Sequence, residues 1–299
     1  MKRLNALLAG AMLSFGSLAD GLPPTVLQAL KAAQIPAASV AVVVQPVDAA
    51  TPLVAHNAAQ PMNPASVMKL VTTYAALDLL GPAWTWKTTA WIDAVPTDGI
   101  LNGNLYLKGS GDPHFAIEHL AALLRQLRVR GIAHIAGDVV LDRTAFDLPS
   151  LDPGAFDDKP MRPYNVGPDG LLINFGTLHF TLQPDNGKPR VLMETPSDNL
   201  RVDNQLRSGN GACGSNWKDL ITARLIPENG GNRLELSGTY SPLCGEKPLN
   251  LAPLPADAQA GGLLRSLWKE LGGSLAGQVR NGSVAVGSQL IAQHESAPL

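Results

Sequence analysis

One stretch decides the fold of this chain: Asn63-Pro64-Ala65-Ser66-Val67-Met68-Lys69, followed directly by the apolar run Leu70-Val71-Thr72-Thr73-Tyr74-Ala75-Ala76-Leu77. Ser66 and Lys69 are three residues apart at the start of a predicted helix, so their side chains should lie on the same face, one turn apart. The positive end of the helix dipole favours a neutral lysine and a nascent alkoxide there. This pattern is typical of an acyl-transferring serine whose base is a lysine.

The Ser-x-x-Lys spacing is weak by itself, because the chain contains it three times. Ser215/Lys218 lies in a loop rich in glycine and asparagine, and Ser266/Lys269 sits within a helix, away from the favourable dipole end. Only Ser66 follows Pro-Ala and opens a long apolar helix. The alternative is a first-turn serine that caps the helix beside a solvent-exposed lysine. Spacing and context alone leave both interpretations open.

The composition indicates a globular exported protein. The chain has 299 residues, 45% hydrophobic and 16% charged, which is enough for one large core or two modest ones. Its net charge is -2 and no basic patch is present, so nucleic acid is excluded as an expected partner. Residues 1–19 are typical of a secretory signal peptide: a charged start (1–3), an apolar segment (4–18) and small residues before Asp20.

A membrane anchor is the alternative for this first segment. The apolar part is too short to span a bilayer comfortably, and no cysteine follows it for attachment of a lipid. No later segment is apolar enough to cross a bilayer. We therefore expect cleavage, export and no stable membrane span.

The chain has two cysteines, Cys213 and Cys244. In an exported protein, two cysteines most simply form one disulfide. A metal site is the weaker alternative, because no histidine lies between them to complete a set of ligands. The six histidines form no recognisable triad or metal-binding spacing, and no cofactor is expected.

The order of predicted elements changes along the chain. The first part has helices over 22–33 and 66–80 and strands over 38–45 and 53–57, an α+β start that Gly81-Pro82 ends. From Trp84 onward the pattern is one of short strands and turns. The further strands are expected over 86–92, 99–108, 135–141, 171–182, 190–195, 223–226, 234–240 and 283–286, with helices over 117–130 and 261–272 and a long loop over 147–163.

Three further motifs follow the serine helix in order: Trp84-x-Trp86-x-Thr88, then Leu105-x-Leu107-x-Gly109-x-Gly111-Asp112-Pro113, then Arg162-Pro163-Tyr164-Asn165-x-x-Pro168-Asp169-Gly170-Leu171-x-x-Asn174. Together with Asn63 to Lys69, they resemble the penicillin-binding D-alanyl-D-alanine carboxypeptidase/endopeptidases of the class C type, peptidase family S13. The resemblance covers essentially everything after the signal peptide, and the cysteine pair fits it.

The resemblance implies an α/β fold: a β-lactamase/transpeptidase-like catalytic domain interrupted by a β-rich inserted region. On that basis residues 20–83 are the N-terminal half of the catalytic domain, 84–255 the inserted region, and 256–299 the start of the return. It implies a periplasmic enzyme in which Ser66 attacks the carbonyl between two D-alanines of a peptidoglycan stem peptide. Lys69 is then the general base, and the backbone N–H of Ser66 supplies half of the oxyanion hole. β-Lactams would acylate the same serine as inhibitors.

The resemblance also assigns a substrate contact to an aspartate pair. Asp157-Asp158 matches a place where the family has an aspartate near the side-chain amine of the stem peptide's third residue, and Asp158 is the candidate. The alternative, which turn chemistry favours, is a pair of loop-capping aspartates. Asp112-Pro113 is interpreted as a turn.

Two family motifs, S-x-N on a helix and K-T-G on an edge strand, have no convincing equivalent. Ser197-Asp198-Asn199 and Arg207-Ser208-Gly209 are tempting, but we expect their polar stretch to offer neither helix nor strand, and only seven residues separate Asn199 from Arg207. Lys87-Thr88-Thr89 is expected to be a packed strand. The family has both motifs after the inserted region, so the chain looks C-terminally truncated. The rival interpretation is a catalytically incompetent remnant, at most a peptidoglycan-binding module.

Overall fold

The computed structural model describes residues 21–185 and 187–298, so the signal peptide predicted over residues 1–19 lies outside the described residues. The chain forms two compact units, which divide between Leu79 and Leu80. The domain boundaries drawn from the sequence at residues 83 and 255 remain predictions.

The first unit contains the predicted α+β elements. Helix α1 (Pro24–Ala32) is followed by an antiparallel hairpin of β1 (Val42–Val44) and β2 (Val54–His56). The side-chain amide of Asn57 fastens the hairpin to the preceding turn by donating to the carbonyl oxygen of Val40, at 2.9 Å. The first helix and both strands predicted from the sequence are confirmed, although each is shorter than predicted.

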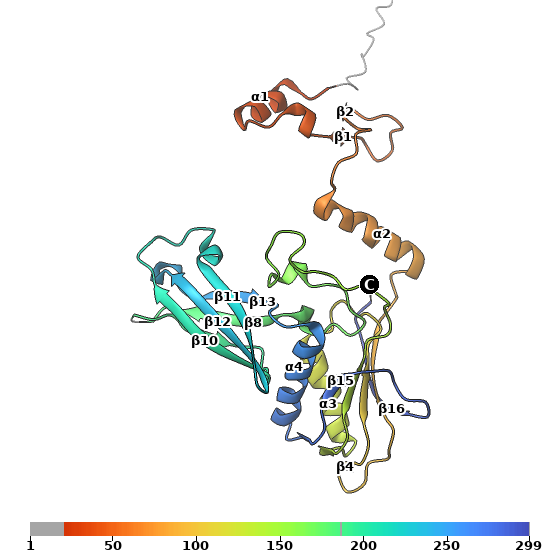
Figure 1. Ribbon diagram of the computed structural model, residues 1–299. Helices are drawn as coiled ribbons and strands as arrows, with labels where there is room; N and C mark the ends of the chain where they lie inside the picture. Colours follow the sequence, from red (N-terminus) through yellow and green to blue (C-terminus); the bar gives the residue numbers. More distant parts are fainter. Residues whose placement is uncertain (1–20, 186, 299) are drawn as a thin grey trace, which may run out of the picture. The chain divides into compact units, whose positions relative to one another are not determined.

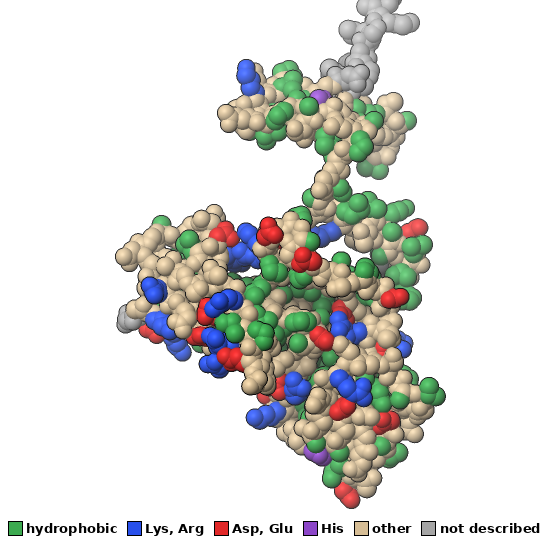
Figure 2. Space-filling model, viewed as in Figure 1, with side chains coloured by type: hydrophobic (Ala, Val, Ile, Leu, Met, Phe, Trp, Pro, Cys, Tyr) green, Lys and Arg blue, Asp and Glu red, His purple; other side chains and the backbone are tan. Residues whose placement is uncertain are grey.

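Helix α2 (Met68–Leu80) has apolar residues distributed around its axis rather than on one face, and Figure 2 shows hydrophobic side chains on its visible side. Its charged residues are Lys69 and Asp78. A helix that is apolar all round is normally packed inside a core. None of the residues of α2 is buried, and Leu70 and Tyr74 are 72% and 71% exposed. The helix ends at Gly81, whose φ of +82° suits glycine, and Pro82 follows.

The second unit begins with a five-stranded mixed sheet (Figure 1). Its strands run in the order β15 (Val279–Asn281), β7 (Val139–Asp142), β5 (Leu105–Lys108), β3 (Lys87–Ile92) and β16 (Gln289–Glu295). Strand β3 is antiparallel to both of its neighbours, and the other pairs are parallel. A small parallel sheet of β14 (Ser274–Leu275), β6 (His134–Ile135) and β4 (Ile100–Leu101) accompanies it.

Helices α3 (Ile117–Val129) and α4 (Ala256–Glu270) cover this sheet and close the first core. Helix α3 contributes leucines at the 3–4 spacing of one helix face, which are Leu120, Leu123, Leu124 and Leu127. Helix α4 contributes Leu263, Leu264 and Trp268. Residues 256–295, which the sequence interpretation assigns to a return toward the catalytic domain, therefore supply a helix and three strands to this unit.

A second core lies between two three-stranded sheets. One sheet consists of β13 (Lys247–Leu251), β8 (Leu178–Gln183) and β9 (Arg190–Met193), all antiparallel. The other consists of β10 (Leu200–Ser208), β12 (Gly231–Tyr240) and β11 (Ile221–Glu228), with β10 parallel to β12. A disulfide joins Cys213 and Cys244 beside this core, with a Cα–Cα distance of 4.8 Å. The predicted disulfide is therefore present.

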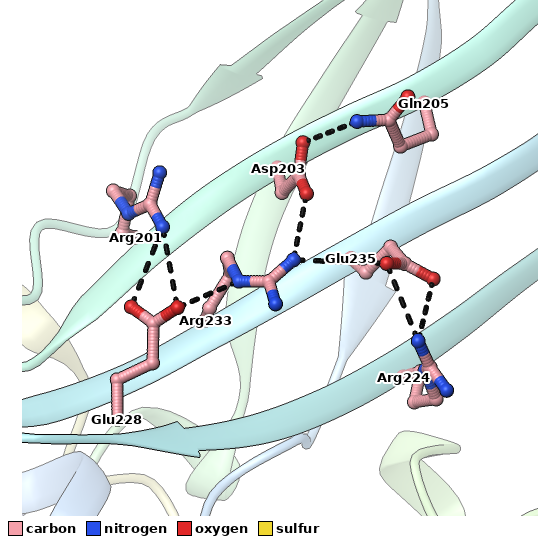
Figure 3. A network of polar contacts seen from close by, with 7 residues as sticks. All are labelled: Arg201, Asp203, Gln205, Arg224, Glu228, Arg233 and Glu235. Atoms are coloured by element: carbon pink, nitrogen blue, oxygen red, sulfur yellow. Dashed lines mark hydrogen bonds and ion pairs between the residues drawn. The ribbon is translucent and has the colours of Figure 1, made fainter.

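The outward face of the second sheet carries a network of alternating charges (Figure 3). Arg233, on the central strand β12, donates to Glu228 at 2.7 Å and to Asp203 at 2.8 Å. Arg201 and Arg224 extend the network to both sides. Ion pairs that solvent reaches add little stability each. The main effect of the network is to keep the outward face of the β10–β12–β11 sheet polar, which disfavours association with apolar surfaces.

Five local predictions are wrong. The strands predicted over 99–108 and over 135–141 each divide into two short strands that belong to different sheets. Residues 200–208 form strand β10, because Leu200 and Leu206 point into the second core at strand spacing although the residues between them are polar. Residues 283–286 form no strand; the strands of that region are β15 and β16. The strand predicted over 171–182 begins only at Leu178, after a short 3-10 turn.

The mixed α/β class predicted from the sequence is confirmed. Across residues 21–185 and 187–298, no helix has both the length and the apolar character that crossing a bilayer requires.

Candidate active site

The segment before α2 holds Ser66 in a short 3-10 turn, Ala65–Val67. The side-chain oxygen of Asn63 accepts a hydrogen bond from the backbone N–H of Ala65 at 2.9 Å, and the N–H of Val67 donates to the carbonyl oxygen of Pro64 at 2.9 Å. Ala65 itself has a φ of +43°, which is uncommon for alanine. The sequence interpretation gave Asn63 no role, although an asparagine two residues before a turn is a known local signal.

Lys69 reaches back to the serine. Its Nζ donates to the Oγ of Ser66 at 3.1 Å. The two side chains therefore meet on one helix face, as the spacing predicts, and both are exposed. At this separation a neutral lysine amine could instead accept the proton of the hydroxyl group. The catalytic roles of Ser66 and Lys69 stay a prediction.

The backbone N–H of Ser66 is also available. Within the described residues it donates to no acceptor, because the turn's hydrogen bonds begin at Val67. An N–H group at a helix start favours negative charge nearby. The N–H of Ser66 therefore has no competing acceptor among the described residues.

The other two Ser-x-x-Lys pairs form no hydrogen bond between serine and lysine in the described structure. The Nζ of Lys218 lies 5.5 Å from the ring centre of Trp217. Ser266 and Lys269 lie within the last two turns of α4, where Lys269 is exposed. Only Ser66 and Lys69 have the contact that nucleophile activation requires.

The two substitute motifs have structural roles. Asn199 donates to the carbonyl oxygen of Ala258 at 2.8 Å, and Ser197 donates to Asn199 at 2.7 Å, so both tie the chain to the start of α4. Asp198 pairs with Arg265 on the same helix. Arg207 and Ser208 end strand β10, the same strand that begins just after Asn199. These contacts agree with the interpretation that neither motif belongs to an active site.

In the aspartate pair, the side chain of Asp157 accepts hydrogen bonds and the side chain of Asp158 accepts none among the described residues. Asp157 accepts from the hydroxyl of Tyr164 at 2.6 Å and from the side-chain amide of Asn165 at 2.8 Å. The Tyr164 hydrogen bond, with those from Asn165 and Lys159, lowers the pKa of Asp157. Asp158 has a φ of +57°, and its carboxylate is exposed and makes no polar contact among the described residues.

Asp158 borders a cavity of about 390 Å³ in the second unit. The cavity has apolar walls from Met161 and Leu249, and Arg162 and Lys218 also line it. The predicted turn at Asp112 is present, because its Oδ1 accepts from the backbone N–H of His114 at 2.9 Å. In the described part of the chain, no group of three or more histidine, cysteine, aspartate or glutamate side chains is arranged to hold a metal ion.

Comparison with models of protein families identifies the family of this chain. The model of the D-Ala-D-Ala carboxypeptidase 3 (S13) family matches residues 25–299. The chain belongs to this family. The resemblance seen in the sequence motifs is therefore confirmed at the level of the family.

Curated relatives show how much of such a protein this chain represents. It is 27% identical over 273 residues to the D-alanyl-D-alanine carboxypeptidase of Actinomadura sp. (strain R39), covering 85% of this chain and 48% of that protein. It is 24% identical over 246 residues to the D-alanyl-D-alanine carboxypeptidase DacB of Haemophilus influenzae, covering 82% of this chain and 50% of that protein. The chain spans about half the length of the curated relatives it matches.

Solved structures agree on the fold. The crystal structure of penicillin binding protein 4 (dacB) from Haemophilus influenzae matches with a TM-score of 0.61 and 25% identity, covering 79% of this chain and 52% of that one. The same protein complexed with a novel beta-lactam matches with a TM-score of 0.56 and 24% identity, covering 79% of this chain and 49% of that one. The predicted α/β fold of penicillin-binding type is confirmed by this likeness.

Proposed function

We propose that Ser66 and Lys69 form the acylating half of a serine-type D-Ala-D-Ala carboxypeptidase/endopeptidase site that acts on peptidoglycan stem peptides. The observation that carries the proposal is the 3.1 Å contact between the Nζ of Lys69 and the Oγ of Ser66 at the start of an apolar helix. Membership of the S13 family supports the reaction class. Cleavage of the predicted signal peptide would deliver the enzyme to the periplasm.

The chemistry follows from the two side chains. A neutral Lys69 takes the proton of the Ser66 hydroxyl while Oγ bonds to the carbonyl carbon between the two D-alanines. The N–H of Ser66 stabilises the oxyanion. The carbon–nitrogen bond then breaks, the amine leaves with a proton, and an ester remains on Ser66. Water hydrolyses this ester and restores the hydroxyl. A β-lactam would react at the same Oγ through its ring amide.

Asp158 is the proposed substrate contact. Its carboxylate makes no polar contact among the described residues and borders a cavity, so it can pair with an amine without giving up another partner. Asp157 is a poorer candidate, because Tyr164 and Asn165 already occupy its oxygens.

Labelling with a fluorescent penicillin tests the acylation. We expect covalent label on the unmodified chain and none on Ser66→Ala. The matched control is Ser266→Ala, which removes the serine of another Ser-x-x-Lys pair and should leave labelling unchanged. Absence of label on the unmodified chain at saturating reagent would overturn the proposal.

A second candidate function is a peptidoglycan-binding module without catalysis. The absence of any buried residue in α2 favours it, because an active-site helix must be held rigidly to position its nucleophile. Sedimentation with purified cell-wall sacculi distinguishes the two functions. Binding that is equal in the unmodified chain and in Ser66→Ala, with no penicillin label on either, supports the module. Label that depends on Ser66 supports the enzyme.

A further inference from the structure

Histidines that lie far apart in the sequence meet where α3 packs against β16. The rings of His119, on α3, and His294, on β16, are stacked with centroids 4.5 Å apart and planes inclined by 23°. His114 lies 5.6 Å from His119, and Phe115 lies 5.4 Å from His294. The His119–His294 stack therefore joins a helix to a strand through two ionisable rings.

Three buried polar atoms in or near this stack have no hydrogen-bond partner among the described residues. They are the Oγ1 of Thr88, the Oδ2 of Asp112 and the Nε2 of His294. Thr88 lies directly opposite His294 in the register of β3 and β16, and Asp112 is close enough to act on the charge of His294. Thr88 and Asp112 are only 1% and 4% exposed. A buried polar atom left unpaired is costly, so this is a weak point of an otherwise well-packed core.

Apart from the histidine stack, strand β16 is held by Ala292, which is buried in the first core, by hydrogen bonds between Ser296 and Trp86, and by the contacts that follow. It lies at the edge of the five-stranded sheet and pairs with β3 alone, with a break in register between Leu290 and Ala292. On the helix side, the amide of Gln126 donates to the carbonyl oxygen of Gln293 at 3.1 Å. At its end, Thr85 donates to Glu295 at 2.6 Å. An edge strand held this way can separate without unfolding the rest of the sheet.

We propose that the His119–His294 stack is a proton-operated latch, in which a neutral His294 holds β16 against α3 and protonation of His294 releases this edge strand. A neutral His294 ring can stack on His119 at 4.5 Å, whereas a charged His294 ring would be buried with its Nε2 unpaired among the described residues. Separation of β16 from α3 lets water reach the charged His294 ring.

Burial of His294 and the charges around it determine whether acid stabilises or releases β16. Burial and the neighbouring His119 lower the pKa of His294, and Asp112 acts in the opposite sense. The closed strand thus favours the neutral ring. The elements that pack against His294 carry these ionisable groups: Asp112 and His114 in the segment after β5, Glu118, His119, Arg125 and Arg128 on α3, Lys87 on β3 and Glu295 on β16 itself.

Hydrogen exchange of the full chain tests the latch. Amide protection in β16 is compared at pH 7.5 and pH 5.5 after correction for intrinsic exchange, with the amides of β8 and β13 in the second core as an internal reference. We expect protection of β16 to fall by about tenfold at the lower pH while the reference strands change little. Equal protection at both pH values, or an equal loss in all strands, would overturn the latch.

Substitutions of the histidines test whether the pH response of β16 comes from this stack or from other groups that titrate in acid. His294→Phe keeps an aromatic ring but cannot take a proton, so protection of β16 should no longer depend on pH. His294→Gln cannot take a proton either and replaces the first variant if that one does not fold. His119→Phe should keep part of the response, because burial alone still lowers the pKa of His294. His179→Gln, on β8, is the matched control and should keep the full response. A response that survives in His294→Phe or in His294→Gln contradicts the proposal.

Discussion

The Nζ of Lys69, in the first turn of α2, lies 3.1 Å from the Oγ of Ser66 in the 3-10 turn that leads into this helix. Because both side chains belong to one short segment, their contact depends on local backbone geometry and on the turn that Asn63 stabilises. The Ser66–Lys69 contact is thus preorganised within the first unit.

Replacing Lys69 should slow the acylation of Ser66 strongly. We expect Lys69→Ala to slow penicillin labelling by about 10²-fold or more, because the serine loses its general base. Lys69→Arg should be equally slow, since a guanidinium stays charged and cannot accept a proton. Stopped labelling reactions give the rates. Lys269→Ala, from the Ser-x-x-Lys pair in α4, is the control. Normal labelling of Lys69→Arg would show that Lys69 supplies only charge.

The apolar surface of α2 should make the chain associate with itself. Leu70→Gln combined with Tyr74→Gln should reduce both self-association and the binding of a hydrophobic dye, because these side chains are 72% and 71% exposed. Sedimentation velocity and dye fluorescence measure the two effects. Leu243→Gln, at a position 74% exposed outside α2, should change neither. An unchanged sedimentation profile in the α2 variant would refute the role of this helix surface.

The disulfide between Cys213 and Cys244 should stabilise the second unit. Closing a loop across a sequence separation of 31 restricts the unfolded chain, so Cys213→Ser with Cys244→Ser should lose about 2–4 kcal/mol of unfolding free energy. Denaturant unfolding measures the loss. A reducing agent should weaken the unmodified chain by a similar amount and leave the double variant unaffected. A reductant effect on the double variant would point to another cause.

Asp142 should make the second unit sensitive to strong acid. It is 1% exposed and accepts hydrogen bonds from the hydroxyl of Thr144 at 2.6 Å and from the backbone N–H of Val284 at 2.9 Å. Burial raises the pKa of Asp142, but these hydrogen bonds outweigh burial and lower the pKa below 3.8.

The sign of the acid effect follows from this lowered pKa. The folded state binds the proton less well than the unfolded state, so the stabilisation is complete above pH 3.8 and is lost as the pH falls through the folded pKa. Asp142→Asn should cost about 1–3 kcal/mol at neutral pH and flatten the acid limb of the stability curve. Asp98→Asn, on an exposed turn, is the control. An unchanged acid limb in Asp142→Asn would contradict the assignment.

Local signals made some elements predictable. Helix α2 begins after Asn63-Pro64 and ends before Gly81-Pro82 because these residues stop or start a helix whatever surrounds them. Strand β10 was missed because its polar residues hide the spacing of Leu200 and Leu206, and only packing against the second core makes that spacing decisive.

The sequence by itself determined the meeting of Ser66 and Lys69, because three residues span one helical turn and no other part of the chain is needed to bring them together. Only the tertiary structure decided the meeting of His119 and His294, and the binding of Asn199 to the start of α4. Those contacts depend on which strands pair and which helix covers them. Pairing and packing are long-range choices that spacing along the chain does not encode.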